Sequence, residues 1–191
     1  MEALVALHDQ EIVHGDIKPS NVMLTRNGTA KLIDIGSAMD VESQLDSKPQ
    51  CHRCTPIYAS IEVLSGEKTL PGSDLVSLGY LAMELLTGKS LFAGADDLKQ
   101  LIRVKHHLRE HFTRYLPDNL DHCETLVELL HLLLGANEFH NPGVSQTDSV
   151  LKLLNQFPTN YPVIDLTKNW VEELWDLRDQ PADEVSSDQA P

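Results

Sequence analysis

Residues 12–36 read IVHGDIKPSNVMLTRNGTAKLIDIG, and this stretch decides the fold. It contains two runs that favour β-strands, residues 21–25 and 29–35, separated by Arg26-Asn27-Gly28. Asn-Gly between two such runs is typical of a tight turn, because both residues tolerate a positive φ. The sequence therefore predicts a small β-hairpin with Asp34-Ile35-Gly36 at its end.

The polar residues around this hairpin suit phosphoryl transfer. His14-Gly15-Asp16, Lys18 and Asn21 come before the turn, and Asp34 follows it. Transfer of a phosphoryl group needs a carboxylate that orients a hydroxyl and accepts its proton, and a cation that faces the phosphate. It also needs oxygen ligands for Mg²⁺, which an amide and a second carboxylate can provide. The stretch supplies each of these groups.

This pattern resembles the catalytic loop (residues 12–21) and the metal-binding motif (residues 34–36) of the eukaryotic protein kinases. The resemblance implies that Asp16 is the catalytic base and that Lys18 is the catalytic cation that faces the nucleotide phosphate. It also implies that Asn21 and Asp34 bind the cofactors, ATP and Mg²⁺, as metal ligands. Lys18, two residues after Asp16, is in the style of the serine/threonine kinases.

Two downstream motifs extend the resemblance in the family's order. Residues 55–62, TPIYASIE, look like the end of an activation segment that spans residues 34–62, in which a catalytic Thr55 would bond the catalytic aspartate and lysine. Residues 74–88 look like the buried central helix of the C-terminal lobe, and its Asp74 would cap the backbone of the catalytic loop. The resemblance gives structural roles to four residues: His14, Gly36, Glu62 and Asp74.

Hydrophobic periodicity predicts a mainly α-helical chain with one small β-hairpin. Residues 74–87 are apolar all round, which is typical of a fully buried helix, with Ser73 as a candidate N-cap and Gly88 just past the end. Other helices are expected at residues 1–9, 96–108, 124–134, 147–156 and 167–179, whereas residues 38–56 show no period and are expected to form a long loop.

The resemblance covers residues 1–157, which we expect to form a kinase-like C-terminal lobe with the N-terminal lobe absent. No Gly-x-Gly-x-x-Gly occurs in the sequence, and no residue matches the lysine or glutamate of an N-terminal lobe. The chain is either a fragment of a full kinase or a naturally truncated relative. We favour the fragment, because the chain starts inside a helix.

Residues 158–191 are expected to form an acidic tail. Residues 165–191 hold eight acidic and two basic residues, and Trp170, Leu174 and Leu177 follow a helical period. We expect this amphipathic helix to dock on the domain rather than on a partner, with disorder from about residue 181.

Three positions depart from the kinase pattern. Gly15 replaces an arginine that pairs with a phosphate in the activation segment, and Ile35 replaces a phenylalanine. Glu62 keeps the family's glutamate, but the best alignment places His140 where the arginine partner belongs. An ion pair with a histidine would weaken as the pH rises through the histidine pKa.

Charge and composition exclude several classes of protein. The 191 residues carry a formal net charge of −14, so a nucleic-acid binder, which needs a basic stripe, is not expected. No apolar stretch approaches the roughly 20 residues of a membrane span, and residues 1–9 do not resemble a signal peptide. We expect no membrane contact and a cytoplasmic or nuclear location.

Two further clusters have alternative interpretations. Cys51-His52-Arg53-Cys54 is expected to hold free thiols; a redox disulfide, or a zinc site with His122 or Cys123, are the alternatives. Eight basic residues at positions 99–114 are expected to form a solvated helix face, with docking of an acidic substrate or of the acidic tail as the alternative.

Two functions follow from the resemblance. The first is a protein serine/threonine kinase lobe, which transfers the γ-phosphate of MgATP to protein hydroxyl groups. The second is a non-catalytic lobe that binds a partner kinase or a scaffold. The presence of every C-lobe residue needed for chemistry favours the first, and the absence of an N-terminal lobe supports the second. The sequence does not indicate an oligomeric state.

Overall fold

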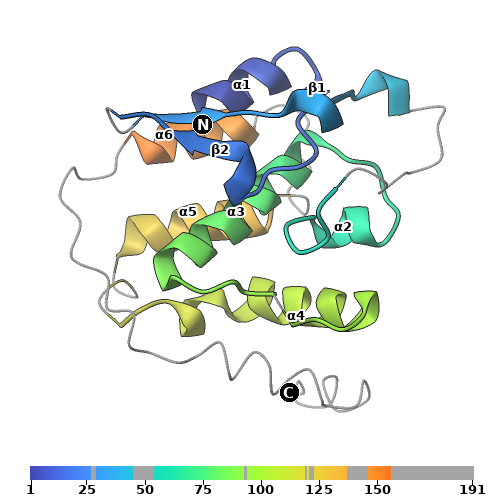
Figure 1. Cartoon of the computed structure of the whole chain (residues 1–191). Coiled ribbons are helices and arrows are strands. Elements are labelled where there is room, and N and C mark those ends of the chain that lie inside the picture. Colours follow the sequence, from blue (N-terminus) through green and yellow to red (C-terminus); the bar gives the residue numbers. More distant parts are fainter. Residues whose placement is uncertain are drawn as a thin grey trace, which may run out of the picture.

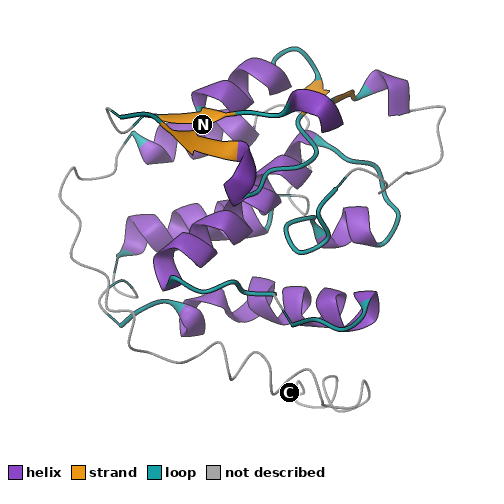
Figure 2. Cartoon of the chain, in the orientation of Figure 1, coloured by secondary structure: helices purple, strands orange, loops and turns teal. Residues whose placement is uncertain are grey.

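The computed structural model describes residues 1–26, 29–44, 54–92, 94–118, 120, 123–136 and 146–155. Within these ranges helices dominate and the strands are short (Figure 2). The helices are α1 (Glu2–His8), α2 (Ile61–Leu64), α3 (Pro71–Thr87), α4 (Leu98–His111), α5 (Glu124–Leu134) and α6 (Gln146–Leu154). The strands are β1 (Ile12–Val13), β2 (Val22–Leu24), β3 (Ala30–Leu32) and β4 (Met39–Asp40).

The predicted hairpin is confirmed as an antiparallel pair of β2 and β3. Val22 pairs with Leu32, and Leu24 pairs with Ala30. The N–H of Thr25 donates to the carbonyl of Thr29 at 2.9 Å, which closes the end of the ladder beside the turn. Asn27 and Gly28 of the turn lie outside the described residues.

A second antiparallel pair joins β1 to β4, with Ile12 opposite Asp40 and Val13 opposite Met39. The prediction of a loop from residue 38 is therefore wrong at its start. A two-residue strand is too short to show a period of two, so the sequence pattern gives no signal for it. Residues 45–53 of the predicted loop lie outside the described part of the chain.

Helix α3 runs through the middle of the molecule, with α1 and α6 on one side and α4 on the other (Figure 1). It starts at Pro71, three residues before the predicted start, because proline suits the first helical position. Ser73 therefore is not the N-cap, although its Oγ accepts the N–H of Leu70 at 3.2 Å. Gly88 ends the helix as predicted, in the left-handed conformation at φ 66°.

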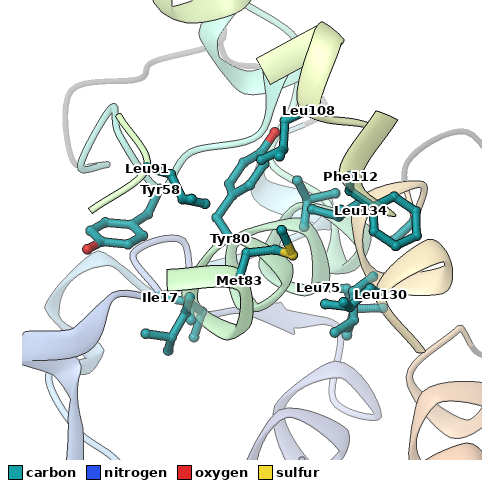
Figure 3. Close-up of a cluster of buried hydrophobic side chains, with 14 of the residues drawn as sticks. Ile17, Tyr58, Leu75, Tyr80, Met83, Leu91, Leu108, Phe112, Leu130 and Leu134 are labelled. Carbon is teal, nitrogen blue, oxygen red and sulfur yellow. The ribbon is translucent and has the colours of Figure 1, made fainter. Parts of the chain in front are cut away.

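The hydrophobic core surrounds α3, which packs against α5 and α6. Gly79 lets α3 and α5 approach closely, because a Cβ there would lie 3.0 Å from Leu134 and 3.1 Å from Leu133. The prediction of a fully buried helix fails near the C-terminal end, where Leu85 is 70% exposed. Large side chains with under 2% exposure include Ile17, Leu75, Tyr80, Met83, Leu108, Leu130 and Leu134 (Figure 3).

The remaining predicted helices of residues 1–157 are confirmed to within a few residues as α1, α4, α5 and α6. The predicted helix at residues 167–179 and the acidic tail lie outside the described residues. Among the helices that are described, none is long and apolar enough to cross a membrane.

Candidate functional site

The backbone of the catalytic loop is fixed by one buried carboxylate. Asp74, in the first turn of α3, is 1% exposed. Its Oδ2 accepts the N–H of His14 at 2.8 Å, and its Oδ1 accepts the N–H of Gly15 at 2.9 Å. These bonds put the carboxylate in the capping role that the resemblance implies for Asp74.

A histidine that sequence reasoning did not single out completes this contact. His8, at the end of α1, places Nε2 at 2.9 Å from Asp74 Oδ2 and Nδ1 at 2.7 Å from Thr147 Oγ1 of α6. The imidazole therefore joins α1, α3 and α6 directly behind the catalytic loop. Its place in a helical run gave no sequence signal, because a histidine on an apolar face is usually a packing residue.

Gly15 has a structural reason to replace the family's arginine. Its φ of 78° lies in the left-handed region that favours glycine, and a Cβ there would lie 3.0 Å from the carbonyl oxygen of Ser37. A side chain at this position would strain the loop between the buried His14 and Asp16. The backbone conformation at this position therefore favours glycine over the arginine of the kinase pattern.

Asp16, Lys18 and Thr55 meet in one hydrogen-bonded cluster. Lys18 Nζ lies 2.6 Å from Asp16 Oδ2 and 2.8 Å from Thr55 Oγ1. Thr55 in turn donates to Asp16 Oδ1 from its hydroxyl at 2.7 Å and from its backbone N–H at 3.0 Å. The loop after β1 and the segment before α2, which are 39 residues apart in sequence, therefore converge on one carboxylate.

These contacts keep Asp16 ionised. Partial burial raises the pKa of Asp16, but the hydrogen bonds from Lys18 and Thr55 outweigh burial, so that the pKa lies below the ordinary aspartate value. At neutral pH the carboxylate is therefore a negatively charged acceptor. A hydroxyl that approaches it can be oriented by a hydrogen bond, which is the geometric requirement for a general base.

Asn21 is fixed so that its amide oxygen is available to a cation. The side chain is 4% exposed, and its Nδ2 donates to the carbonyl of Asp16 at 2.8 Å and to Asp16 Oδ2 at 3.2 Å. Because the nitrogen is used in this way, the oxygen is the atom that remains to bind a ligand. A buried amide oxygen next to a carboxylate suits Mg²⁺.

Backbone contacts of Ile33, the residue before Asp34, hold Asp34 at the same end of the hairpin as Asn21. The N–H of Ile33 donates to the carbonyl of Asn21 at 2.9 Å, and the carbonyl of Ile33 lies 3.3 Å from His14 Nε2. Asp34 has a φ of 62°, and its Oδ1 accepts the N–H of Gly36 at 3.2 Å. An exposed carboxylate on a loop held at this position fits a divalent cation, as does Asn21.

His14 joins the catalytic loop to the strand that precedes Asp34. Its ring is fully buried. Nδ1 accepts the N–H of Asp16 at 3.3 Å, so Nε2 carries the proton that faces the carbonyl of Ile33. The side chain thus lies where the resemblance gives it a steadying role.

Comparison with known proteins agrees with this geometry. The family model of the protein kinase domain matches residues 1–157. This chain belongs to the protein kinase family. The matched range is the one over which the catalytic loop, the metal motif, the activation segment and the central helix follow one another in the kinase order.

Curated kinases match most of the chain at moderate identity. A dual specificity protein kinase of Dictyostelium discoideum is 28% identical, over 98% of this chain and 31% of its own length. Cyclin-dependent kinase-like 1 of Caenorhabditis elegans is 29% identical, over 93% of this chain and 52% of its own length. A probable cyclin-dependent kinase 10 of Dictyostelium discoideum is 31% identical, over 87% of this chain and 46% of its own length. The chain spans about a third to a half of the length of these kinases.

Glu62 of the kinase activation segment has an arginine partner that the sequence analysis did not assign. Its Oε1 accepts a hydrogen bond from Arg109 Nη2 of α4 at 2.8 Å. The prediction that Glu62 pairs with His140 is not tested, because His140 lies outside the described residues. Arg109 is far from the aligned position in sequence, so only the fold shows that it faces Glu62.

Tyr58 makes a second contact of the activation segment that sequence reasoning missed. Its hydroxyl donates to Glu84 Oε2 of α3 at 2.6 Å. Burial raises the pKa of Tyr58, and the hydrogen bond to Glu84 raises it further, so the phenol stays protonated and remains a donor. Together with the contacts of Thr55, this bond fixes the segment that leads away from Asp16.

The cysteines differ from the expectation of free thiols. Cys54, which directly precedes Thr55, is disulfide-bonded, so that expectation is wrong for Cys54. Cys123 is free, and Cys51 and His122 lie outside the described residues. The C-x-x-C spacing is compatible with either state, so the sequence could not decide between them. Within the described part of the chain, no three metal-ligating side chains come together in a zinc-type cluster.

Proposed function

We propose that residues 1–157 are the C-terminal lobe of a protein serine/threonine kinase, which transfers the γ-phosphate of MgATP to hydroxyl groups of protein substrates. The observation that carries this proposal is the ionised Asp16 carboxylate, held by Thr55 and Lys18 at 2.6–3.0 Å. Family membership supports the reaction class. The serine/threonine preference is supported by Lys18, which follows Asp16 by two residues.

The proposed roles follow from the atoms that each side chain presents. Asp16 Oδ atoms orient the attacking hydroxyl and accept its proton as the phosphate bond forms. The ammonium group of Lys18 bonds Asp16 and Thr55 and has one further N–H group. This N–H donates to the negatively charged phosphate and offsets its charge. Thr55 keeps the Asp16 carboxylate in one orientation, which lowers the entropic cost of reaching the reactive geometry.

Asn21 and Asp34 are the residues that would hold Mg²⁺. The metal, when bound, supplies positive charge that shields the phosphate oxygens. The chain's own contribution is the rigid placement of the two ligands: hydrogen bonds to Asp16 fix Asn21, and contacts of Ile33 with Asn21 and His14 fix the start of the Asp34 loop.

Isothermal titration of MgATP into this chain tests the proposed nucleotide site. We expect saturable binding by the wild-type chain and at least about tenfold weaker binding by Asp34→Asn, because the substitution removes a charged metal ligand. Asp96→Asn, at an exposed position before α4, is the matched control and should bind as the wild type does. Equal affinity of all three proteins, or no binding by any of them, would contradict the proposed nucleotide site. It would favour the alternative of a non-catalytic lobe that binds a partner kinase or a scaffold.

A further inference from the structure

Helix α4 carries a lysine that is completely removed from solvent. Lys105 belongs to the basic stretch 99–114, which was predicted to be a solvated face, yet its exposure is 0%. Its Nζ donates to the carbonyl oxygens of Ile57 and Ala59, both at 2.8 Å. It also lies over two aromatic rings, 3.8 Å from the centroid of Tyr80 and 4.3 Å from that of Phe92. The prediction of a solvated face is therefore wrong at this position.

Burial of a lysine at this position is a cost to folding that a methionine of similar length would avoid. Burial lowers the pKa of Lys105 well below the ordinary lysine value, and the nearby positive charge of Arg109 lowers it further. Two hydrogen bonds to carbonyl groups and two ring contacts offset part of this cost. The ring of Tyr80 extends from α3 toward Leu108 of α4, which follows Lys105 by three residues (Figure 3). Unlike a methionine, the lysine can donate hydrogen bonds, and these bonds fix the backbone carbonyls of Ile57 and Ala59.

Those carbonyls belong to a tight turn that begins at Thr55. The carbonyl of Thr55 accepts the N–H groups of Tyr58 and Ala59, both at 3.0 Å, so hydrogen bonds join the two ends of the turn. One end of this turn touches Asp16 through Thr55, and the other end touches Lys105. Four residues after Lys105, and so on the same face of α4, Arg109 holds the Glu62 carboxylate, which follows the turn.

We propose that Lys105 positions Thr55 against Asp16, because hydrogen bonds from its Nζ fix the turn that Thr55 begins. Lys105 touches neither substrate nor nucleotide, and it is a positioning residue rather than a catalytic one. The inference rests on the proposed function, since it concerns the contact that orients the proposed base. It assigns to α4 a role in the geometry of the catalytic centre in addition to its role in the core.

Amide hydrogen exchange measured by NMR on the whole chain tests this inference without nucleotide. The N–H of Thr55, which bonds Asp16, reports on the turn, and the N–H of Gly15, which bonds Asp74, reports on the rest of the catalytic loop. In Lys105→Met we expect exchange at Thr55 to speed up by about tenfold, because two strong hydrogen bonds to the turn are lost. Exchange at Gly15 should stay within about twofold of the wild-type rate.

Control variants separate positioning from simple loss of stability. Leu108→Ala removes a fully buried side chain of the same helix without touching either carbonyl, so it should leave the ratio of the Thr55 and Gly15 rates unchanged. Lys105→Arg keeps the charge and the donors and should restore most of the wild-type ratio. Lys105→Gln, whose side chain is one atom shorter and uncharged, should raise the ratio, and it serves if the methionine variant does not fold.

The inference is overturned if Lys105→Met, or Lys105→Gln in its place, leaves the ratio of the two rates at its wild-type value, whether both amides speed up together or neither changes. It is also overturned if Leu108→Ala raises the ratio as much as the lysine variants do. None of these outcomes depends on phosphotransfer. Failure of this inference is therefore distinguishable from failure of the proposed kinase activity.

Discussion

Replacement of Asp74 by asparagine should lower the free energy of unfolding by about 3–5 kcal/mol. The carboxylate, which is 1% exposed, accepts hydrogen bonds from the backbone N–H groups of His14 and Gly15 and lies 2.9 Å from His8 Nε2. An asparagine would offer one acceptor oxygen and would turn an NH₂ group toward one of these partners. Urea denaturation followed by circular dichroism measures the change.

Asp96→Asn is the control for this prediction, because Asp96 is exposed and its substitution should change stability by less than about 0.5 kcal/mol. Amide hydrogen exchange gives a second measurement. In Asp74→Asn the N–H groups of His14 and Gly15 lose their carboxylate acceptor and should exchange faster than in the wild type. A loss of stability below about 1 kcal/mol would show that Asp74 does not hold the loop as described.

Replacement of Arg109 by methionine should lower the free energy of unfolding by about 2–4 kcal/mol, by the same amount at pH 6 and at pH 9. The substitution leaves the Glu62 carboxylate, which is 19% exposed, without this cation. A guanidinium group stays charged throughout this range, so the contribution of the ion pair persists. A histidine partner would contribute only below its pKa, and the contribution would be lost as the pH rose.

Urea titrations of the wild type and of Arg109→Met at the two pH values measure this difference. Lys99→Met, at an exposed position on the same helix, is the control for removal of a positive charge and should change stability by under about 1 kcal/mol. A difference between wild type and Arg109→Met of under about 1 kcal/mol at both pH values would contradict Arg109 as the partner of Glu62.

That the proposed reacting groups lie together could be predicted from the sequence, because they belong to motifs of fixed spacing. Asp16, Lys18 and Asn21 lie within six residues, and the hairpin that brings Asp34 to them is marked by its own Asn-Gly turn. Thr55 was foreseen only through the family resemblance. In each case the information is local or is carried by a motif.

The supporting residues could not be predicted, because their roles depend on packing between distant elements. His8 reaches Asp74 across 66 residues, and Lys105 reaches Ala59 across 46. In the sequence, Lys105 and Arg109 are members of a basic run of the kind that usually faces solvent. Their burial follows from the way α4 packs beside the activation segment, which no periodicity in α4 alone reveals.

Transfer of labelled phosphate from MgATP to a mixed protein substrate such as casein is the most direct test of the proposed kinase activity. We expect transfer to serine and threonine by the wild-type chain and a loss of about 10²–10⁴-fold in Asp16→Asn, because the amide cannot accept the proton of the attacking hydroxyl. Asp96→Asn should keep the wild-type rate. Equal transfer by the wild type and Asp16→Asn would contradict the assignment of Asp16 as the base of a kinase reaction.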